Sequence, residues 1–177
     1  LSALQTRMSK LRNIPDILKK ILELLPKNSN CMDVMRTISS VMGISSLKVK
    51  SILLAEKNDQ INVSLRLISV FGPALIYWYH FSHNGKRIKT ETLPTDTVAH
   101  NFLKLYHQTN EIDTLILKTF DVSLILYAEH DFNASTFTSR VIVSTRSDIY
   151  SGITGAIGAL RGPLHGGANE AAMKILE

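Results

Sequence analysis

Apolar residues recur along the chain at spacings of three and four, the period that predicts amphipathic helices. One stripe runs through residues 1–11, and a second follows a helix-start signal at Pro15 and continues to Leu25. Residues 26–30 are typical of a loop. A further helix is predicted over residues 33–42, with Gly43 at or just past its end and with an inward face formed by Val34, Ile38 and Val41.

The middle of the chain has a less regular pattern. Residues 45–60 are polar, show no clean period and are predicted to form a loop or a weak helix. Residues 61–81 are apolar with Arg66 as the single charged residue, so a membrane span, which needs about 20 residues, is one interpretation. A buried pair of helices broken at Pro73 is favoured, because charge inside a membrane is costly and proline interrupts helices.

The second half of the chain continues the helical pattern. Thr95 and Asp96 are predicted to cap a helix that carries Val98, Phe102 and Leu105. The next helix is predicted over residues 111–129, with an inward face formed by Ile112, Leu115, Ile116, Phe120, Leu124 and Tyr127. Because no segment alternates in the manner of a strand, the fold class is predicted to be all-α.

Composition and charge narrow the function classes. The 177 residues carry a net charge of +5, but the basic residues are scattered, which favours small anionic ligands, or no functional meaning of the charge, over nucleic acid. The single cysteine, Cys31, excludes an internal disulfide and a cysteine metal cluster, and it fits a reducing compartment. His80 and His83 lack a third ligand at suitable spacing, so a solvated or hydrogen-bonded helix end is predicted there and not a metal site.

Residues 161–170 contain the most distinctive candidate chemistry. Pro163 ends any incoming helix, and Gly166 and Gly167 allow a close approach of backbone or ligand, so His165 is predicted on a loop between two helices. A histidine in such a loop is suited to donate a hydrogen bond to a developing oxyanion. The alternative is a glycine-rich turn with a surface histidine that has no function.

Two segments upstream of this loop add to the candidate site. Residues 129–135 place His130 and Asn133 on one helical face, which indicates either a group of polar ligands or a capped helix end. Residues 151–160 place four small residues on one face, namely Gly152, Gly155, Ala156 and Ala159. Such a face allows two helices to pack closely, either inside the fold or across a subunit interface.

These motifs together resemble the citrate synthases, and among them the 2-methylcitrate synthases. The resemblance lies in the residues at 127–140, 147–151 and 155–170, with the histidine-glycine-glycine loop as the most specific part, and it extends upstream to residues 32–37 and 77–85. It implies a multi-helical, citrate-synthase-like fold. Residues 1–177 then form part of the large helical domain, truncated at both ends, with an N-terminal part and a C-terminal catalytic part absent.

The resemblance also implies a reaction and its residues. Citrate synthases join the α-carbon of an acyl-CoA to oxaloacetate and then hydrolyse the thioester, without a metal or redox cofactor. It implies that His165 donates to the thioester oxygen and that His130 binds oxaloacetate, with Asn133 placed to help. Ser135 is predicted to orient His165. A second catalytic histidine and an aspartate base are expected downstream, so the 177-residue chain alone is expected to be inactive.

The resulting prediction is an acyltransferase, a cytoplasmic homodimer that uses propionyl-CoA and oxaloacetate to make 2-methylcitrate in propionate catabolism, through the methylcitrate cycle. The first alternative is citrate synthase, which uses acetyl-CoA. The two acyl groups differ by one methylene, which a pocket distinguishes by about 1–3 kcal/mol. The second alternative, from another class, is a helical interaction module without catalysis.

Overall fold

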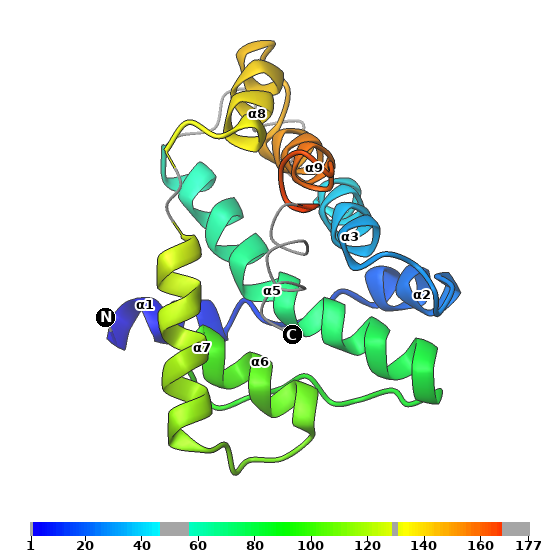
Figure 1. The fold of residues 1–177 in the computed structure, drawn as a ribbon, viewed down its shortest axis with the longest axis vertical. Coiled ribbons are helices and arrows are strands. Elements are labelled where there is room, and N and C mark those ends of the chain that lie inside the picture. Colours follow the sequence, from blue (N-terminus) through cyan, green and yellow to red (C-terminus); the bar gives the residue numbers. More distant parts are fainter. Residues whose placement is uncertain (1, 47–56, 129–130, 168–177) are drawn as a thin grey trace. The chain divides into compact units, whose positions relative to one another are not determined.

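The computed structural model describes residues 2–46, 57–128 and 131–167, and these residues form helices and loops without any strand (Figure 1). The predicted all-α class is therefore confirmed. The helices are α1 (Ser2–Ser9), α2 (Asp16–Leu24), α3 (Cys31–Ser45), α5 (Lys57–Asn84), α6 (Val98–His107), α7 (Thr114–Tyr127), α8 (Ala134–Ser144) and α9 (Ile149–Leu160). The region predicted as a loop or weak helix lies largely outside the described residues, and its described end already belongs to α5.

The chain divides into two compact units. Unit 1 contains Leu1–Asn28 and Ile61–His130, and unit 2 contains Ser29–Gln60 and Asp131–Glu177. The core of unit 1 joins the apolar faces of α2, α5 and α6, as the helical periods predict. Its buried members include Leu18 and Leu22 from α2, Val70 and Trp78 from α5, and Leu103 from α6.

The predicted break at Pro73 is wrong, because α5 runs without interruption from Lys57 to Asn84 with Pro73 inside it. Proline has no N–H, so the carbonyl of Ser69 loses its helical hydrogen bond, at a cost of about 3 kcal/mol. Burial offsets this cost, since Pro73 itself and its neighbours Val70, Ala74 and Tyr77 are almost completely buried.

By length and composition alone, residues Asp59–Asn84 of α5 are able to cross a membrane. In unit 1, however, this helix behaves as a core helix, with Trp78 only 2% exposed. His80 Nε2 lies 3.2 Å from the carbonyl oxygen of Leu105 and 3.1 Å from that of Tyr106, in the last turn of α6. Since carbonyls only accept, the ring donates, and the predicted hydrogen-bonded role of His80 is confirmed. No group of three metal-ligating side chains occurs among the described residues.

The start of α6 also corrects the sequence analysis. Its N-cap is Thr97, whose hydroxyl accepts from the His100 N–H at 3.1 Å, and not Thr95 or Asp96. Asp96 is instead buried, with 2% of its surface exposed, and accepts from the Lys104 ammonium at 2.9 Å and the Leu93 N–H at 3.0 Å. A carboxylate one position before the cap is thus turned inward to hold the loop before α6.

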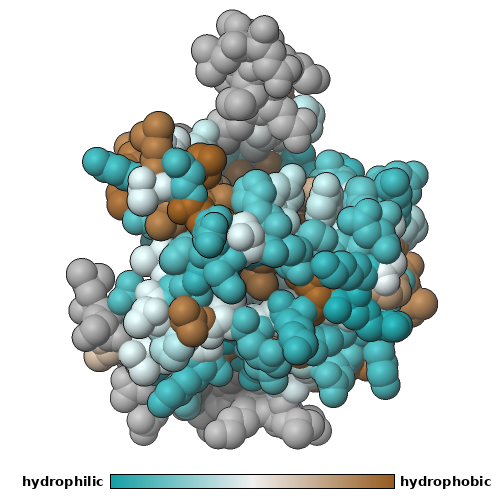
Figure 2. Space-filling view, turned by 90° about the horizontal axis from the view of Figure 1, so that it is seen from below, coloured by the Kyte–Doolittle hydropathy of each residue, from teal (hydrophilic) through white to brown (hydrophobic). Residues whose placement is uncertain are grey.

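The prediction for the helix over residues 111–129 is wrong about its inward face. No residue of α7 is buried, and several residues expected to face inward are exposed, namely Leu115, Ile116, Leu124 and Tyr127. The apolar side chains of α7 point to several sides of the helix, so packing one face against the rest of unit 1 cannot bury all of them. Figure 2 shows one face of the molecule, on which hydrophobic surface, drawn brown, gathers in places. Exposure of this kind marks surfaces that contact other polypeptide.

Glu23 links three parts of unit 1. It accepts from the Tyr77 hydroxyl at 2.6 Å and from two nitrogens of the Arg87 guanidinium at 2.8 and 2.9 Å. These hydrogen bonds lower the pKa of Glu23 from 4.5 to about 2, and the bond from Arg87 has the largest effect. Burial, together with the bond to Glu23, raises the pKa of Tyr77 to about 12.

We expect the Glu23 contacts to stabilise the protein above pH 4.5 and to lose this effect as the pH falls towards 2, because protonation removes the charge. Since Arg87 is largely exposed, solvent screens the ion pair and its contribution to stability is small. Glu23→Gln should reduce the acid-dependent loss of stability, measured by thermal melting between pH 5 and 2. The control is Asp16→Asn, on a carboxylate that is 92% exposed and lies 3.9 Å from Lys19. Equal acid sensitivity in wild type and Glu23→Gln would contradict the prediction.

Unit 2 is built from α3, α8 and α9. The helix α3 begins at Asn30, whose side chain accepts from the Met32 N–H, and it continues through Gly43 to Ser45. The expectation that Gly43 ends the helix is therefore wrong. A Cβ at Gly43 would lie 3.0 Å from Cβ of Tyr150 in α9, so the glycine serves close helix contact and not termination.

The small-residue face of α9 packs against α8 inside unit 2. A Cβ at Gly152 would lie 2.9 Å from Val143, and a Cβ at Gly155 would lie 2.2 Å from Ile142. Of the two alternatives left open for this face, packing inside the fold is the one that the structure shows for these glycines. These contacts hold α8 against α9, and the candidate site lies at the first turn of α8 and just after the end of α9.

Candidate active site

Asn133 begins α8 and shapes its first turn. Its side-chain oxygen accepts from the Thr136 N–H at 2.8 Å and from the Ser135 hydroxyl at 2.6 Å. This is the capped helix end that the sequence analysis left as an alternative for these residues. A predicted substrate ligand thus also has a structural role. The other predicted ligand, His130, lies outside the described residues.

The loop after α9 is closed by its own backbone. Gly166 N donates to the Leu160 carbonyl oxygen at 2.8 Å, and His165 N donates to the Gly162 carbonyl oxygen at 3.0 Å. A Cβ at residue 166 would lie 2.2 Å from that Leu160 oxygen, so only glycine fits. As predicted, His165 follows the end of a helix, and the segment expected to begin the next helix lies mostly outside the described residues.

This loop brings His165 to the first turn of α8. His165 Nε2 lies 3.0 Å from Ser135 Oγ, and the Ser135 backbone N–H points at the same nitrogen from 3.4 Å. A backbone N–H can only donate, so it favours the tautomer in which Nε2 accepts and Nδ1 carries the hydrogen. In that tautomer the single hydroxyl hydrogen of Ser135 is shared between two acceptors, Nε2 and Asn133 Oδ1. Among the residues that the structure describes, none hydrogen-bonds Nδ1. The imidazole therefore has one nitrogen held by the protein and one N–H directed elsewhere.

Arg161 lies at the base of this loop, and sequence reasoning gave it no role. Its Nε lies 2.9 Å from Asp33 Oδ1, on the first turn of α3. The only sequence signal was that both residues lie in segments that carry the family resemblance. Two other arginines of unit 2 differ in setting. Arg140 stacks over the Phe132 ring at 5.3 Å, and Arg146 has a positive φ of 66°.

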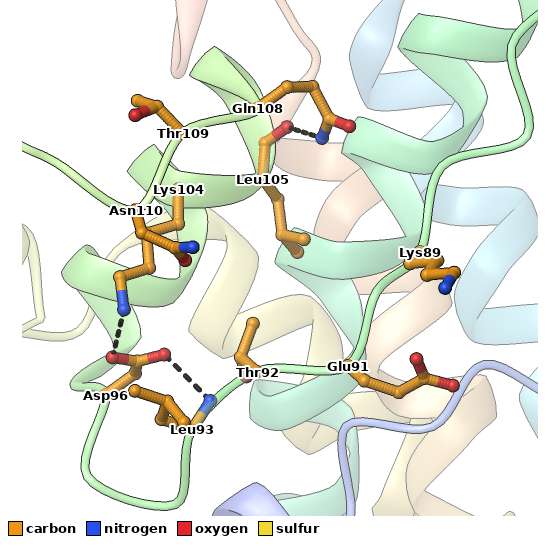
Figure 3. Close-up of a pocket in the computed structure, with 10 residues that line it drawn as sticks. All are labelled: Lys89, Glu91, Thr92, Leu93, Asp96, Lys104, Leu105, Gln108, Thr109 and Asn110. Atoms are coloured by element: carbon orange, nitrogen blue, oxygen red, sulfur yellow. Dashed lines mark hydrogen bonds and ion pairs between the residues drawn. The ribbon is translucent and has the colours of Figure 1, made fainter.

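A cavity of about 510 Å³ lies in unit 1, lined by residues of the loop before α6, of α6 and of the loop after it (Figure 3). Figure 3 shows the Lys104 ammonium directed at Asp96. Behind Asp96, Arg12 donates to its carbonyl oxygen at 2.6 Å and to Thr92 Oγ1 at 2.8 Å. Burial lowers the pKa of Arg12, and the charge of Asp96 opposes this effect. The cluster holds the loop before α6 in place.

Comparison with known proteins defines the class. The family described as "Citrate synthase, C-terminal domain" matches residues 1–177. The 2-methylcitrate synthase of Shewanella oneidensis is 48% identical over 177 residues, which is 100% of this chain and 45% of that protein. The citrate synthase of Mycolicibacterium smegmatis is 40% identical over 92% of this chain and 42% of its own length.

Solved structures agree with this result. Citrate synthase from Thermoplasma acidophilum, in a ternary complex with carboxymethyl coenzyme A and oxaloacetate, superposes with a TM-score of 0.82 at 31% identity. The match covers 97% of this chain and 43% of that one. The chain belongs to the citrate synthase family. It spans less than half the length of the curated relatives named above.

Proposed function

We propose that this chain is part of a 2-methylcitrate synthase, which condenses propionyl-CoA with oxaloacetate and water to give 2-methylcitrate and CoA. The observation that carries the chemistry is the position of His165, with Nε2 held by Ser135 and Nδ1 available. The choice of propionyl-CoA is supported by the 48% identity to the Shewanella oneidensis 2-methylcitrate synthase.

The proposed role of His165 follows from the difficulty of the reaction. Removing a proton from the carbon beside a thioester places negative charge on the thioester oxygen, and a positioned N–H there lowers the barrier. Such a donor contributes about 10²–10³ in rate. His165 would supply this N–H from Nδ1. We assign oxaloacetate binding to His130 and Asn133, and proton removal to an aspartate in the part of the protein outside this chain.

Ser135→Ala is expected to lower kcat of the complete protein by roughly 3–10-fold, the effect of one hydrogen bond worth about 0.5–1.5 kcal/mol. The loss is limited because the backbone N–H at position 135 still reaches Nε2. Steady-state kinetics with both substrates would measure it. The matched control is Ser144→Ala in the last turn of α8, where the exposed hydroxyl donates to the Val141 carbonyl oxygen. Similar kcat values for the two variants would contradict the role of Ser135.

Citrate synthase is the second candidate, favoured by the 40% identity to the Mycolicibacterium smegmatis citrate synthase. The deciding experiment measures thiol release by the complete protein with oxaloacetate, comparing propionyl-CoA with acetyl-CoA. A higher kcat/KM for propionyl-CoA supports 2-methylcitrate synthase, and the reverse supports citrate synthase. Without oxaloacetate-dependent release from either, the catalytic proposal fails and the non-catalytic helical module takes its place.

The 177-residue chain alone is expected to be inactive, as one portion of the large helical domain. We further propose that the complete enzyme is a cytoplasmic homodimer in the methylcitrate cycle of propionate catabolism. Support for a dimer comes from apolar side chains that protrude from α7 and from α8, including Ile125, Leu126 and Phe137. Light scattering of the complete enzyme tests this proposal, and a monomeric mass would contradict it.

A further inference from the structure

The end of α9 is attached to the start of α3 by one ion pair. Arg161 is the C-cap residue of α9, and its Nε bonds Asp33 Oδ1 at 2.9 Å. Asp33 lies in the first turn of α3, behind its N-cap Asn30. The opposite end of α9 is also attached to α3, because the buried Ser39 hydroxyl donates to the Tyr150 carbonyl oxygen at 3.1 Å. Both ends of α9 are thus attached to one helix.

The loop that carries His165 begins directly after Arg161. Its hydrogen bonds all return to this same region, since Gly166 bonds Leu160 and His165 bonds Gly162. The loop therefore moves with the last turn of α9. Among the described residues, Ser135 on α8 is the only one that hydrogen-bonds the His165 ring. A shift of the last turn of α9 would be transmitted to the distance between His165 and Ser135.

We propose that Asp33 is a positioning residue, which acts through Arg161 to hold the His165 loop at its working distance from Ser135. The inference rests on the proposed function, in which His165 donates to the thioester oxygen. Asp33 and Arg161 touch neither substrate. They restrict the loop, so their loss leaves the binding of both substrates intact and reduces the fraction of bound complexes with the imidazole in place.

Arg36 provides a matched control within the same cluster. Its guanidinium bonds the same oxygen, Asp33 Oδ1, also at 2.9 Å, but Arg36 lies on α3 and holds no loop. Removing Arg36 changes the charge near Asp33 by the same amount as removing Arg161. A difference between the two variants therefore reports the attachment of the loop and not the local charge.

The test measures kcat, KM and melting temperature for Asp33→Asn, Arg161→Gln, Arg161→Lys, Arg36→Gln and the double variant Asp33→Asn/Arg161→Gln of the complete protein. Asp33→Asn and Arg161→Gln should each lower kcat about five-fold, which is ~1 kcal/mol at 1.36 kcal/mol per factor of ten. KM for both substrates should stay within about two-fold. The double variant should lose no more than either single variant, because the two residues act as one unit.

The remaining variants separate positioning from stability. Arg161→Lys keeps the charge and should retain at least about half of kcat, and Arg36→Gln should stay within about two-fold of wild type, since exposed ion pairs contribute little by themselves. A fall in kcat of Arg161→Gln that merely matches that of Arg36→Gln would overturn the proposal. So would additive losses in the double variant.

A second readout does not depend on the reaction. The ¹⁵N chemical shifts of the His165 ring report which nitrogen carries hydrogen, and wild type should show Nδ1–H and an accepting Nε2. In Arg161→Gln these shifts should move towards those of a freely exchanging imidazole, and in Arg36→Gln they should not. Unchanged shifts in Arg161→Gln would overturn the positioning role. Failure of the proposed function would appear separately, as wild-type protein without oxaloacetate-dependent thiol release.

Discussion

Gly166→Ala is expected to lower kcat of the complete enzyme by about 100-fold. The added Cβ would lie 2.2 Å from the Leu160 carbonyl oxygen, which is backbone and cannot rotate away. The same oxygen accepts the Gly166 N–H at 2.8 Å, so the bond that closes the loop must break or lengthen. The loop carries His165 with it, and a displacement of about 1 Å at a reacting group costs about 10²-fold.

Gly158→Ala is the control for this prediction. Gly158 lies in α9, and a Cβ there would meet no atom within 4 Å. Alanine also favours helix by about 1 kcal/mol over glycine, so this variant should keep full activity and melt at the same or a higher temperature. Steady-state kinetics and thermal melting of both variants would be compared. Full activity in Gly166→Ala would show that the loop tolerates a Cβ and that its closure does not position His165.

Asp96→Ala is expected to destabilise the protein by about 3–5 kcal/mol, the usual cost of leaving buried charges without their partner. Asp96 faces the Lys104 ammonium at 2.9 Å and His100 Nδ1 at 3.3 Å, and both Asp96 and Lys104 are buried. The buried Arg12 guanidinium, bonded to the Asp96 carbonyl oxygen, would also lose the nearby negative charge. The Leu93 N–H would lose its acceptor as well.

The matched control is Asp113→Ala, which removes another aspartate from unit 1. Asp113 is the N-cap of α7 and accepts from the Leu115 and Ile116 N–H groups. Losing such a cap costs about 1 kcal/mol. Denaturant unfolding of both variants, with the slope of the transition checked for constancy, would measure the difference. Equal destabilisation by the two changes would mean that Asp96 contributes no more than an exposed cap.

Helical periodicity predicted most of the fold because it depends on local spacing. The inward residues of α3, Val34, Ile38 and Val41, are buried as expected. Periodicity failed where packing decides. Gly43 is a helix terminator by propensity, yet it lies inside α3, where a Cβ would come within 3.0 Å of Cβ of Tyr150 in α9. Pro73 is a helix breaker by propensity, yet burial on the α5 face outweighs the lost hydrogen bond.

The candidate site was predictable only in part, because it depends on contacts between distant segments. The sequence analysis predicted that Ser135 orients His165, and the structure places these two side chains 3.0 Å apart. Nothing in the spacing of the sequence links Asp33 with Arg161, since an ion pair between separate helices leaves no periodic signal. Asn133 shows a different limit. Asparagine is suited both to capping a helix and to binding a ligand, and the sequence does not show which of these roles it has.

The uncovered apolar surface of α7 affects how this helix opens and closes. Without buried side chains, α7 is held by its Asp113 cap and by contacts such as that of Phe120 with Phe102, whose ring centroids are 5.2 Å apart. Its amide hydrogens should therefore exchange with solvent through local opening, well before those of α5, when the chain is alone. Covering α7 with other polypeptide would slow that exchange, so the folding of this helix is coupled to assembly.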